Sequence, residues 1–280
     1  MTTMMQSYDA ARVEPPVGAA ASTGDACPNC GTALGDRYCG HCGQKRPDPD
    51  DLTMRALVAH AADEVLSADS KLIGTLRTLV VAPGALTVDW REGRRARWIA
   101  PLRLYLVTSA VYYLTVFDLT RAQTTAQFVG VLAKAAALTG WLSERTASAN
   151  MEAHFETVTT ITSFTGALSM AILAALCFRR ARRPFAEHFV AMLHYSAFAW
   201  ILGTAVYAIT WWIAPDALLG WASAFLMLAG AVYLGVQIRR TERLRTGSAI
   251  GWTLVLVSAN YVVEVFVMTF VVLASAFLPA

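Results

Sequence analysis

The sequence predicts an all-α integral membrane protein with about five transmembrane helices, preceded by a small N-terminal zinc ribbon that contains four cysteines. Three observations support this fold class. The 280 residues are 56% apolar and only 15% charged, which is more apolar than an ordinary soluble domain. Five apolar runs each approach the ~20 residues that cross a hydrocarbon core as a helix. Two matched Cys-x-x-Cys-Gly turns precede all of these runs.

The chain divides into four parts by composition. Residues 1–24 are rich in Ala, Ser, Thr, Gly and Pro and are expected to form a disordered leader. They lack the apolar core of a signal peptide. We therefore expect the N-terminus to stay in the cytosol, where reduced thiols bind metal rather than form disulfides. The zinc ribbon is predicted at 25–46, a linker with surface helices and a basic collar at 47–99, and the membrane domain at 100–280.

The two turns of the predicted ribbon are the strongest motif in the chain. They supply four thiolates, and the glycine after each turn accepts the positive φ that the chain needs there. Four sulfur ligands complete a tetrahedral structural zinc site and leave no open position for catalysis. The short spacing between the turns favours a compact zinc ribbon over a rubredoxin-like iron site. The predicted ligands are Cys27, Cys30, Cys39 and Cys42.

The surroundings of the ribbon argue against nucleic-acid binding. Three basic residues, Arg37, Lys45 and Arg46, are outnumbered by five aspartates in and just after the ribbon, at positions 25, 36, 48, 50 and 51, so it lacks the electrostatic footprint that phosphates require. After the ribbon, one helical pattern covers about 52–66 and a second ends at Pro83-Gly84. Both are too short to cross a bilayer and are expected to lie at its surface.

Arginines predict the direction of the membrane spans, which are expected at roughly 100–119, 158–178, 189–213, 217–238 and 249–274. Thirteen arginines form three blocks beside these runs, at 91–103, 179–183 and 239–245. Threading the spans with the N-terminus inside places all three blocks in the cytoplasm, as the positive-inside rule requires. The C-terminus then lies on the outer side. Residues 128–142 are expected to form an interfacial helix with Lys134 in its middle, and a sixth span is the alternative.

The basic collar just before the first predicted span combines arginines with two tryptophans. Indoles prefer the headgroup layer, and each arginine attracts anionic lipid with ~1 kcal/mol. The collar is therefore predicted to anchor the helix in membrane lipid, and a specific lipid or phosphate site is the alternative. The anchoring residues are Trp90, Arg94, Arg95, Arg97 and Trp98.

Four polar residues fall within the third and fifth predicted spans or at their ends. His188 and His194 begin the third span, whereas Asn260 and Glu264 lie one turn apart in the fifth. Polar groups in a bilayer are costly and face protein, water or a partner. At ~1.5 Å per residue, His194 and Glu264 differ too much in depth to pair directly, and Asn260 is nearer to His194. We interpret Glu264 as a structural polar contact, with a proton or ion path as the alternative.

Taken together, these motifs resemble a bacterial membrane family catalogued as domain of unknown function 3667. The resemblance is carried by Cys42-Gly-Gln-Lys45, Leu76–Gly84, the collar leading into Pro101-Leu-Arg-Leu-Tyr105, Glu187–His194 and Tyr233 with the arginine loop after it. It implies a cytoplasmic zinc ribbon on a multi-span inner-membrane body and brings no assigned activity. Ser196 replaces a further histidine of the family pattern, which weakens a histidine-based metal or catalytic role. The layout is also similar to five-span Yip-type membrane proteins, in architecture only.

The sequence favours a non-enzymatic membrane adaptor or organiser whose ribbon docks a cytosolic protein partner. This hypothesis depends on the closed metal site and on the lack of a convergent catalytic set in the sequence. The alternative is a small transporter or lipid-handling protein that uses His194, Asn260 and Glu264. A membrane enzyme ranks third, because no nucleophile–base pair or glycine-rich phosphate loop is visible.

Overall fold

A computed structural model describes residues 26–48, 53–55, 71–118, 121, 144–213 and 215–275. Its helices are α3 (Lys71–Val81), α4 (Ala85–Arg91), α5 (Pro101–Thr115), α7 (Glu144–Cys177), the 3-10 turn η2 (Arg179–Ala181), α8 (Phe185–Ile213), α9 (Pro215–Thr241) and α10 (Thr246–Ser275). Within the described residues, the only β pairings are two isolated bridges in the ribbon. The predicted leader, most of the helix at 52–66 and the segment 128–142 lie outside this part of the chain.

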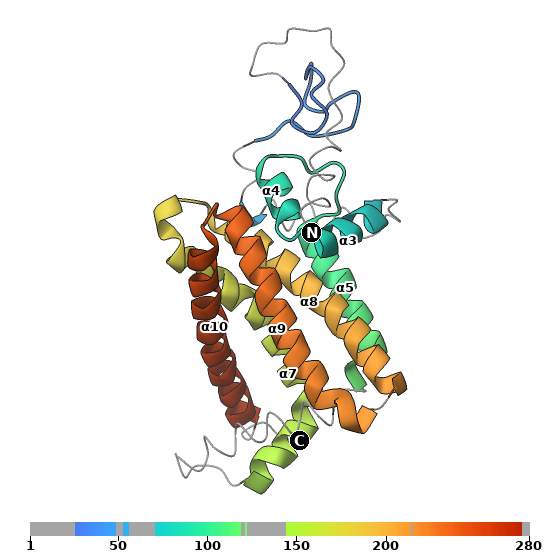
Figure 1. Cartoon of the computed structure of the whole chain (residues 1–280), viewed down its shortest axis with the longest axis vertical. Helices are drawn as coiled ribbons and strands as arrows, with labels where there is room; N and C mark the ends of the chain where they lie inside the picture. The colour runs from blue at the N-terminus through green and yellow to red at the C-terminus, as the bar shows by residue number, and fades with distance from the viewer. Residues whose placement is uncertain are drawn as a thin grey trace.

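Five helices run side by side as a bundle, with α8 at its centre (Figure 1). Helix α8 packs against α5, α7 and α9, and α10 closes the bundle between α7 and α9. Alanines on one face of α7 permit close packing, since Ala167, Ala171 and Ala174 are spaced at helical repeats and are all buried. The apolar core between these helices includes Leu234 and Leu256, both fully buried.

Four helices are long and apolar enough to cross a membrane, within 160–177, 185–213, 220–241 and 246–271. They coincide with the last four predicted spans. The first predicted span, 100–119, contains α5, which is a helix of 15 residues. At ~1.5 Å per residue α5 is shorter than a hydrocarbon core is thick. The bent pair α3 and α4, with 117° between its helices, would be a fifth span if it counted as one.

The two ends of the bundle differ in composition. Helices α5, α8 and α10 begin, and α7 and α9 end, at the end of the bundle that carries the ribbon (Figure 1). All three arginine blocks therefore gather at this end, as the positive-inside argument requires. The opposite end carries exposed tryptophans, Trp211, Trp212 and Trp221, which is the residue type enriched at membrane–water interfaces. The cytoplasmic placement of the ribbon end stays a prediction.

Helices α3 and α4 form a wedge between the ribbon and the bundle (Figure 1). Gly84 separates them in the left-handed conformation, at φ 79°. A Cβ there would lie 3.1 Å from the backbone oxygen of Gln237, so glycine lets the wedge approach α9 closely. The hydroxyl of Tyr233 on α9 donates to the carbonyl oxygen of Leu79 at 2.8 Å and so holds α3 against the bundle. The sequence predicted the end of α3, but it did not predict α4.

Candidate functional site at the junction of ribbon and bundle

The four predicted metal ligands converge in the ribbon. The Sγ atoms of Cys27 and Cys42 lie 3.6 Å apart, as do those of Cys30 and Cys39. All four sulfurs lie within 4.8 Å of one another. An ion bound tetrahedrally by four thiolates at ~2.3 Å holds its sulfurs ~3.8 Å apart. The cluster therefore fits one metal ion with all-sulfur coordination.

Both turns of the ribbon have the same backbone geometry. Gly31 and Gly43 each follow the second cysteine of a turn with φ of 77° and 72°, as the sequence predicted. Each donates its N–H to the carbonyl of the first cysteine, at 2.8 and 2.9 Å. Cys27 and Cys39 are buried with Leu34 in a very small core. With so little apolar burial, a bound ion is the natural source of stability for the ribbon.

The metal ligands differ in their affinity for protons. Burial raises the pKa of Cys27 to about 12, so its thiol is protonated at neutral pH when no cation is near. Burial also raises the pKa of Cys30, but hydrogen bonds with Thr32 and with neighbouring thiols outweigh it and bring that pKa to about 6. A metal ion that binds all four sulfurs must therefore displace protons, and its affinity rises with pH.

Gln44 fixes the ribbon to the membrane body. Its side chain is buried, and its Oε1 accepts hydrogen bonds from the backbone N–H groups of Arg95 and Ala96, at 2.9 and 2.8 Å. Its Nε2 donates to the carbonyl of Lys45 at 2.9 Å. Beside it, Gly93 lies against Pro47, the residue just after the ribbon, which a Cβ would approach to 3.1 Å. The loop before α5 thus serves as a seat for the ribbon.

Asp89 organises the basic collar. This carboxylate is 4% exposed and accepts bonds from Arg94 at 2.5 Å, Arg97 at 2.6 Å and the indole N–H of Trp98 at 2.8 Å. Burial alone raises the pKa of Asp89, but Arg94, Arg97 and Trp98 outweigh it and hold the pKa below its ordinary value. The collar is therefore ordered around an acid inside the protein.

The tryptophans of the collar stack under its arginines. The guanidinium of Arg95 lies 4.4 Å from the ring centroid of Trp90, and that of Arg97 lies 4.8 Å from Trp98. Trp90 is buried against α5 and α8, so its contacts are with protein. Lipid anchoring by the collar as a whole stays a prediction.

A charge network joins α4 to the two arginine loops of the bundle. Nε of Arg91 lies 2.8 Å from Glu187 on α8, and its Nη1 donates to the carbonyl of Thr241 at 2.8 Å. Arg183 lies 2.5 Å from Glu242, which is also 3.8 Å from Arg91. Both glutamates are nearly buried. Breaking a largely buried ion pair leaves an uncompensated charge, so this network holds the wedge in place.

The predicted intramembrane polar residues form two separate groups. His194 is buried in α8, and its Nδ1 lies 2.8 Å from Oγ1 of Thr87 on α4. His188 is also buried, near Arg91 and Arg183 of the charge network. The histidines therefore belong to the junction with the wedge.

Asn260 and Glu264 instead meet α7. Oγ of Ser169 lies 2.6 Å from Oδ1 of Asn260 and 3.3 Å from Oε1 of Glu264. Gly166 makes room for this contact, because a Cβ there would lie 3.3 Å from Glu264. Asn260 thus pairs with α7, whereas the sequence placed it near His194.

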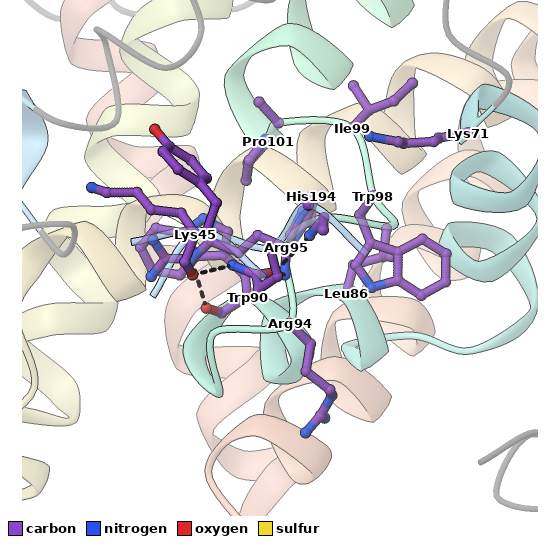
Figure 2. Close-up of a pocket in the computed structure, with 15 residues that line it drawn as sticks. Lys45, Lys71, Leu86, Trp90, Arg94, Arg95, Trp98, Ile99, Pro101 and His194 are labelled. Carbon is purple, nitrogen blue, oxygen red and sulfur yellow. Dashed lines mark hydrogen bonds between the residues drawn. The ribbon is translucent and has the colours of Figure 1, made fainter. Parts of the chain in front are cut away.

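A cavity of about 240 Å³ lies between the ribbon, the wedge and the start of α5 (Figure 2). The ribbon contributes Tyr38, Gln44 and Lys45 to its wall. The wedge and the collar contribute a cationic and aromatic set that includes Lys71, Trp90, Arg94, Arg95 and Trp98, and His194 reaches it from α8. Figure 2 shows the guanidinium of Arg94 directed away from the centre of this set. The cavity is the point where ribbon, wedge and bundle meet.

Sequence reasoning missed the residues that hold this junction together. Asp89 and Gln44 both stand in motifs that the sequence analysis singled out, the collar and the end of the second turn. An aspartate at the head of an arginine-rich stretch, ahead of a membrane span, was a usable sign of an internal ion pair. Thr87 and Ser169 gave no comparable sign, because a hydroxyl in a helix usually bonds its own backbone.

Comparison with known proteins locates one similarity in this same region. Residues 69–113 match the model of a family described as "Protein of unknown function (DUF3667)". The matched residues contain α3, α4, the collar and most of α5, which form the wedge and the seat of the ribbon. Searches of curated proteins and of solved structures found no match. The similarity supports the resemblance to that family and assigns no activity.

Proposed function

We propose that the protein is an adaptor of the bacterial inner membrane that presents a zinc-loaded ribbon to a cytosolic protein partner. The observation that carries this proposal is the attachment of Gln44 to Arg95 and Ala96. Because the Gln44 side chain is buried and makes both bonds, the ribbon is attached to the membrane body at a defined point rather than only through a linker. A partner bound to the ribbon is thereby held at a set orientation to the bilayer.

Zinc is the metal that suits this role. Four thiolates complete its tetrahedral shell, which gives a structural ion without an open coordination position. The cytosolic side is supported by the arginine blocks at the ribbon end of the bundle. On the ribbon, residues 31–33, 35–38 and 40–41 are exposed, and they form the docking surface of the proposal.

Affinity purification from native membranes tests the adaptor role. The intact protein is compared with a Cys27→Ser/Cys30→Ser variant, which removes two metal ligands. Cys177→Ser is the matched control, because Cys177 lies in α7 and outside the metal cluster. We expect a partner that co-purifies with the intact protein and the control and is lost with the double variant. The same proteins in all three eluates would contradict the proposal.

A second function is favoured by the contact of Ser169 with Asn260 and Glu264. Polar groups within α7 and α10 suit a small transporter or a lipid-handling protein. Glu264→Gln keeps the size of the side chain and removes its charge, so a transport or growth phenotype of this variant would support the alternative. A full wild-type phenotype would exclude a role for the carboxylate.

A further inference from the structure

We propose that Ser169, Asn260 and Glu264 form a binding site for one sodium ion between α7 and α10, where the ion competes with a proton on Glu264. The site lies in the bundle and goes beyond the adaptor role, which depends on the ribbon. It supplies a ligand for the second proposed function. Its test measures binding rather than transport, so the site and the transport role can fail separately.

The three side chains meet within the apolar part of the bundle, where α7 packs against α10. Ser169 lies near the middle of the apolar window Thr160–Cys177 of α7. Asn260 and Glu264 lie within the window Thr246–Val271 of α10. All three side chains are half-buried. Polar groups at such a depth are costly unless they serve one another or a ligand.

The hydroxyl of Ser169 has more neighbouring acceptors than protons to donate. Its Oγ lies 2.6 Å from Oδ1 of Asn260 and 3.3 Å from Oε1 of Glu264. It also lies 3.1 Å from the carbonyl oxygen of Gly166. A hydroxyl donates one proton, and the short contact with Asn260 is the best place for it. The carboxylate of Glu264 is then left against other oxygen atoms.

Glu264 has no cationic partner within the part of the chain that the structure describes. Ser169 is its only hydrogen-bonding side chain there, and no lysine, arginine or histidine forms an ion pair with it. An ionised carboxylate in an apolar span needs a positive charge close by. A proton on the carboxylate or a bound cation provides that charge.

The composition of the cluster selects the kind of cation. All of its donor atoms are oxygens, which suit hard cations rather than metals that prefer nitrogen or sulfur. One carboxylate offsets one positive charge, so a monovalent ion leaves the site neutral. A divalent ion would leave a net charge among apolar side chains, at a large cost. Na⁺ meets both conditions.

Close packing of the two helices holds the oxygens together. A Cβ at Gly166 would lie 3.3 Å from Oε1 of Glu264, so glycine lets the carboxylate approach α7. Met170, next to Ser169, and Leu256, one turn before Asn260, are buried in the apolar core that α7 and α10 share. The ligand oxygens are therefore positioned by packing, and a preorganised set loses little entropy when it binds an ion.

Carbodiimide modification of the purified full-length protein, loaded with zinc in detergent, tests the site. Dicyclohexylcarbodiimide reacts with protonated carboxyl groups in apolar surroundings, so a sodium ion that displaces the proton protects Glu264. Peptide mass spectrometry follows the modification of this one residue at mildly acidic pH, in sodium-free buffer and with increasing NaCl. Choline chloride at the same concentration controls for ionic strength, and Glu264→Gln confirms that the modified residue is the intended one.

We expect Na⁺ at about ten times its dissociation constant to slow the modification of Glu264 about tenfold, and choline to leave it within about twofold. Ser169→Ala removes one ligand oxygen and should raise the concentration of Na⁺ for half-protection about tenfold. Ser258→Ala is the matched control and should stay within about twofold of wild type, because Ser258 is an exposed serine of α10 outside the cluster.

Equal modification of Glu264 in Na⁺ and in choline would overturn the proposal, because a proton would then be the only cation at the site. The same sodium dependence in both serine variants would overturn it too, since the hydroxyl of Ser169 would then not bind the ion. If Ser169→Ala does not fold, Asn260→Leu removes the other neutral ligand oxygen and provides the same comparison.

Discussion

The side-chain oxygen of Gln44 lies 2.8 Å from the backbone nitrogen of Ala96, across the boundary between the ribbon and the membrane body. The side-chain amide of Gln44 therefore connects the polar ribbon to the apolar membrane body. The same oxygen also accepts the backbone N–H of Arg95 at 2.9 Å, and the Gln44 side chain itself is buried. Such a contact resists water and gives the ribbon a defined position on the bundle.

Replacing Gln44 by alanine should release the ribbon from its seat. Two partly buried N–H groups would lose their acceptor, at a cost of about 1–3 kcal/mol for each group that water cannot reach. Hydrogen exchange at Arg95 and Ala96 should accelerate, while zinc content stays unchanged. Gln44→Glu retains an acceptor oxygen and should keep most of the protection. Unchanged exchange in the alanine variant would contradict this account of the junction.

Removing the metal should unfold the ribbon and leave the bundle intact. The small core around Leu34 cannot compensate for the loss of four metal–sulfur bonds. A chelator should therefore expose four thiols to a thiol reagent and increase exchange at Ala96, with little change in helical content by circular dichroism. Loss of most helical signal would show instead that the bundle depends on the metal.

The Thr87–His194 bond should be measurable as a coupling between α4 and α8. Thr87→Val keeps the shape and removes the hydroxyl, which should cost about 1–3 kcal/mol because Nδ1 stays buried without its partner. Thr87→Ser should be close to wild type. In a double-mutant cycle with His194→Leu, the valine substitution should cost clearly less in the leucine background. Additive costs would argue that the two side chains do not interact.

Asp89→Asn should destabilise the junction, by about 2 kcal/mol at neutral pH, since its bonds are to charged groups. The pKa of Asp89 is depressed in the folded protein, so its stabilising effect is complete above the unfolded value of ~3.9. That effect is lost as the pH falls through the lower folded pKa. Thermal unfolding in detergent should therefore show a difference between wild type and variant that shrinks below about pH 4. A gap that persists at lower pH would point to packing rather than charge.

The orientation of the bundle can be tested with reporter fusions. If the ribbon end is cytoplasmic, a fluorescent protein inserted after Arg180 should be bright, and alkaline phosphatase there should be inactive. Fusions after Ile213, at the opposite end of α8, should give the reverse result, because alkaline phosphatase needs an oxidising exterior. The reversed pattern at both positions would overturn the positive-inside assignment.

The sequence was informative wherever one physical rule dominates. Hydropathy predicted the four long apolar helices that could cross a membrane, and the cysteine spacing predicted the convergence of Cys27, Cys30, Cys39 and Cys42. The first predicted span, 100–119, stays a prediction, because the described helix α5 ends at Thr115 while the apolar run continues past it. Run length alone does not locate the end of a helix.

The junction could not be predicted because its contacts join residues that are distant in the chain. Thr87 and His194 are separated by 107 positions, and nothing local marks their pairing. The collar was interpreted from its arginines and tryptophans, so the buried role of Asp89 among them went unnoticed. Pairing of Asn260 with Ser169 depends on which faces of α7 and α10 meet, and neither hydropathy nor helical spacing determines this.

The wedge has a consequence for the order in which the protein is made. Helices α3 and α4 leave the ribosome early, but they are fastened to Tyr233 and Thr241, each at least 150 positions later. The wedge can therefore reach its final position only after α9 has been synthesised. The ribbon is therefore synthesised long before the contacts of the wedge with Tyr233 and Thr241 can form.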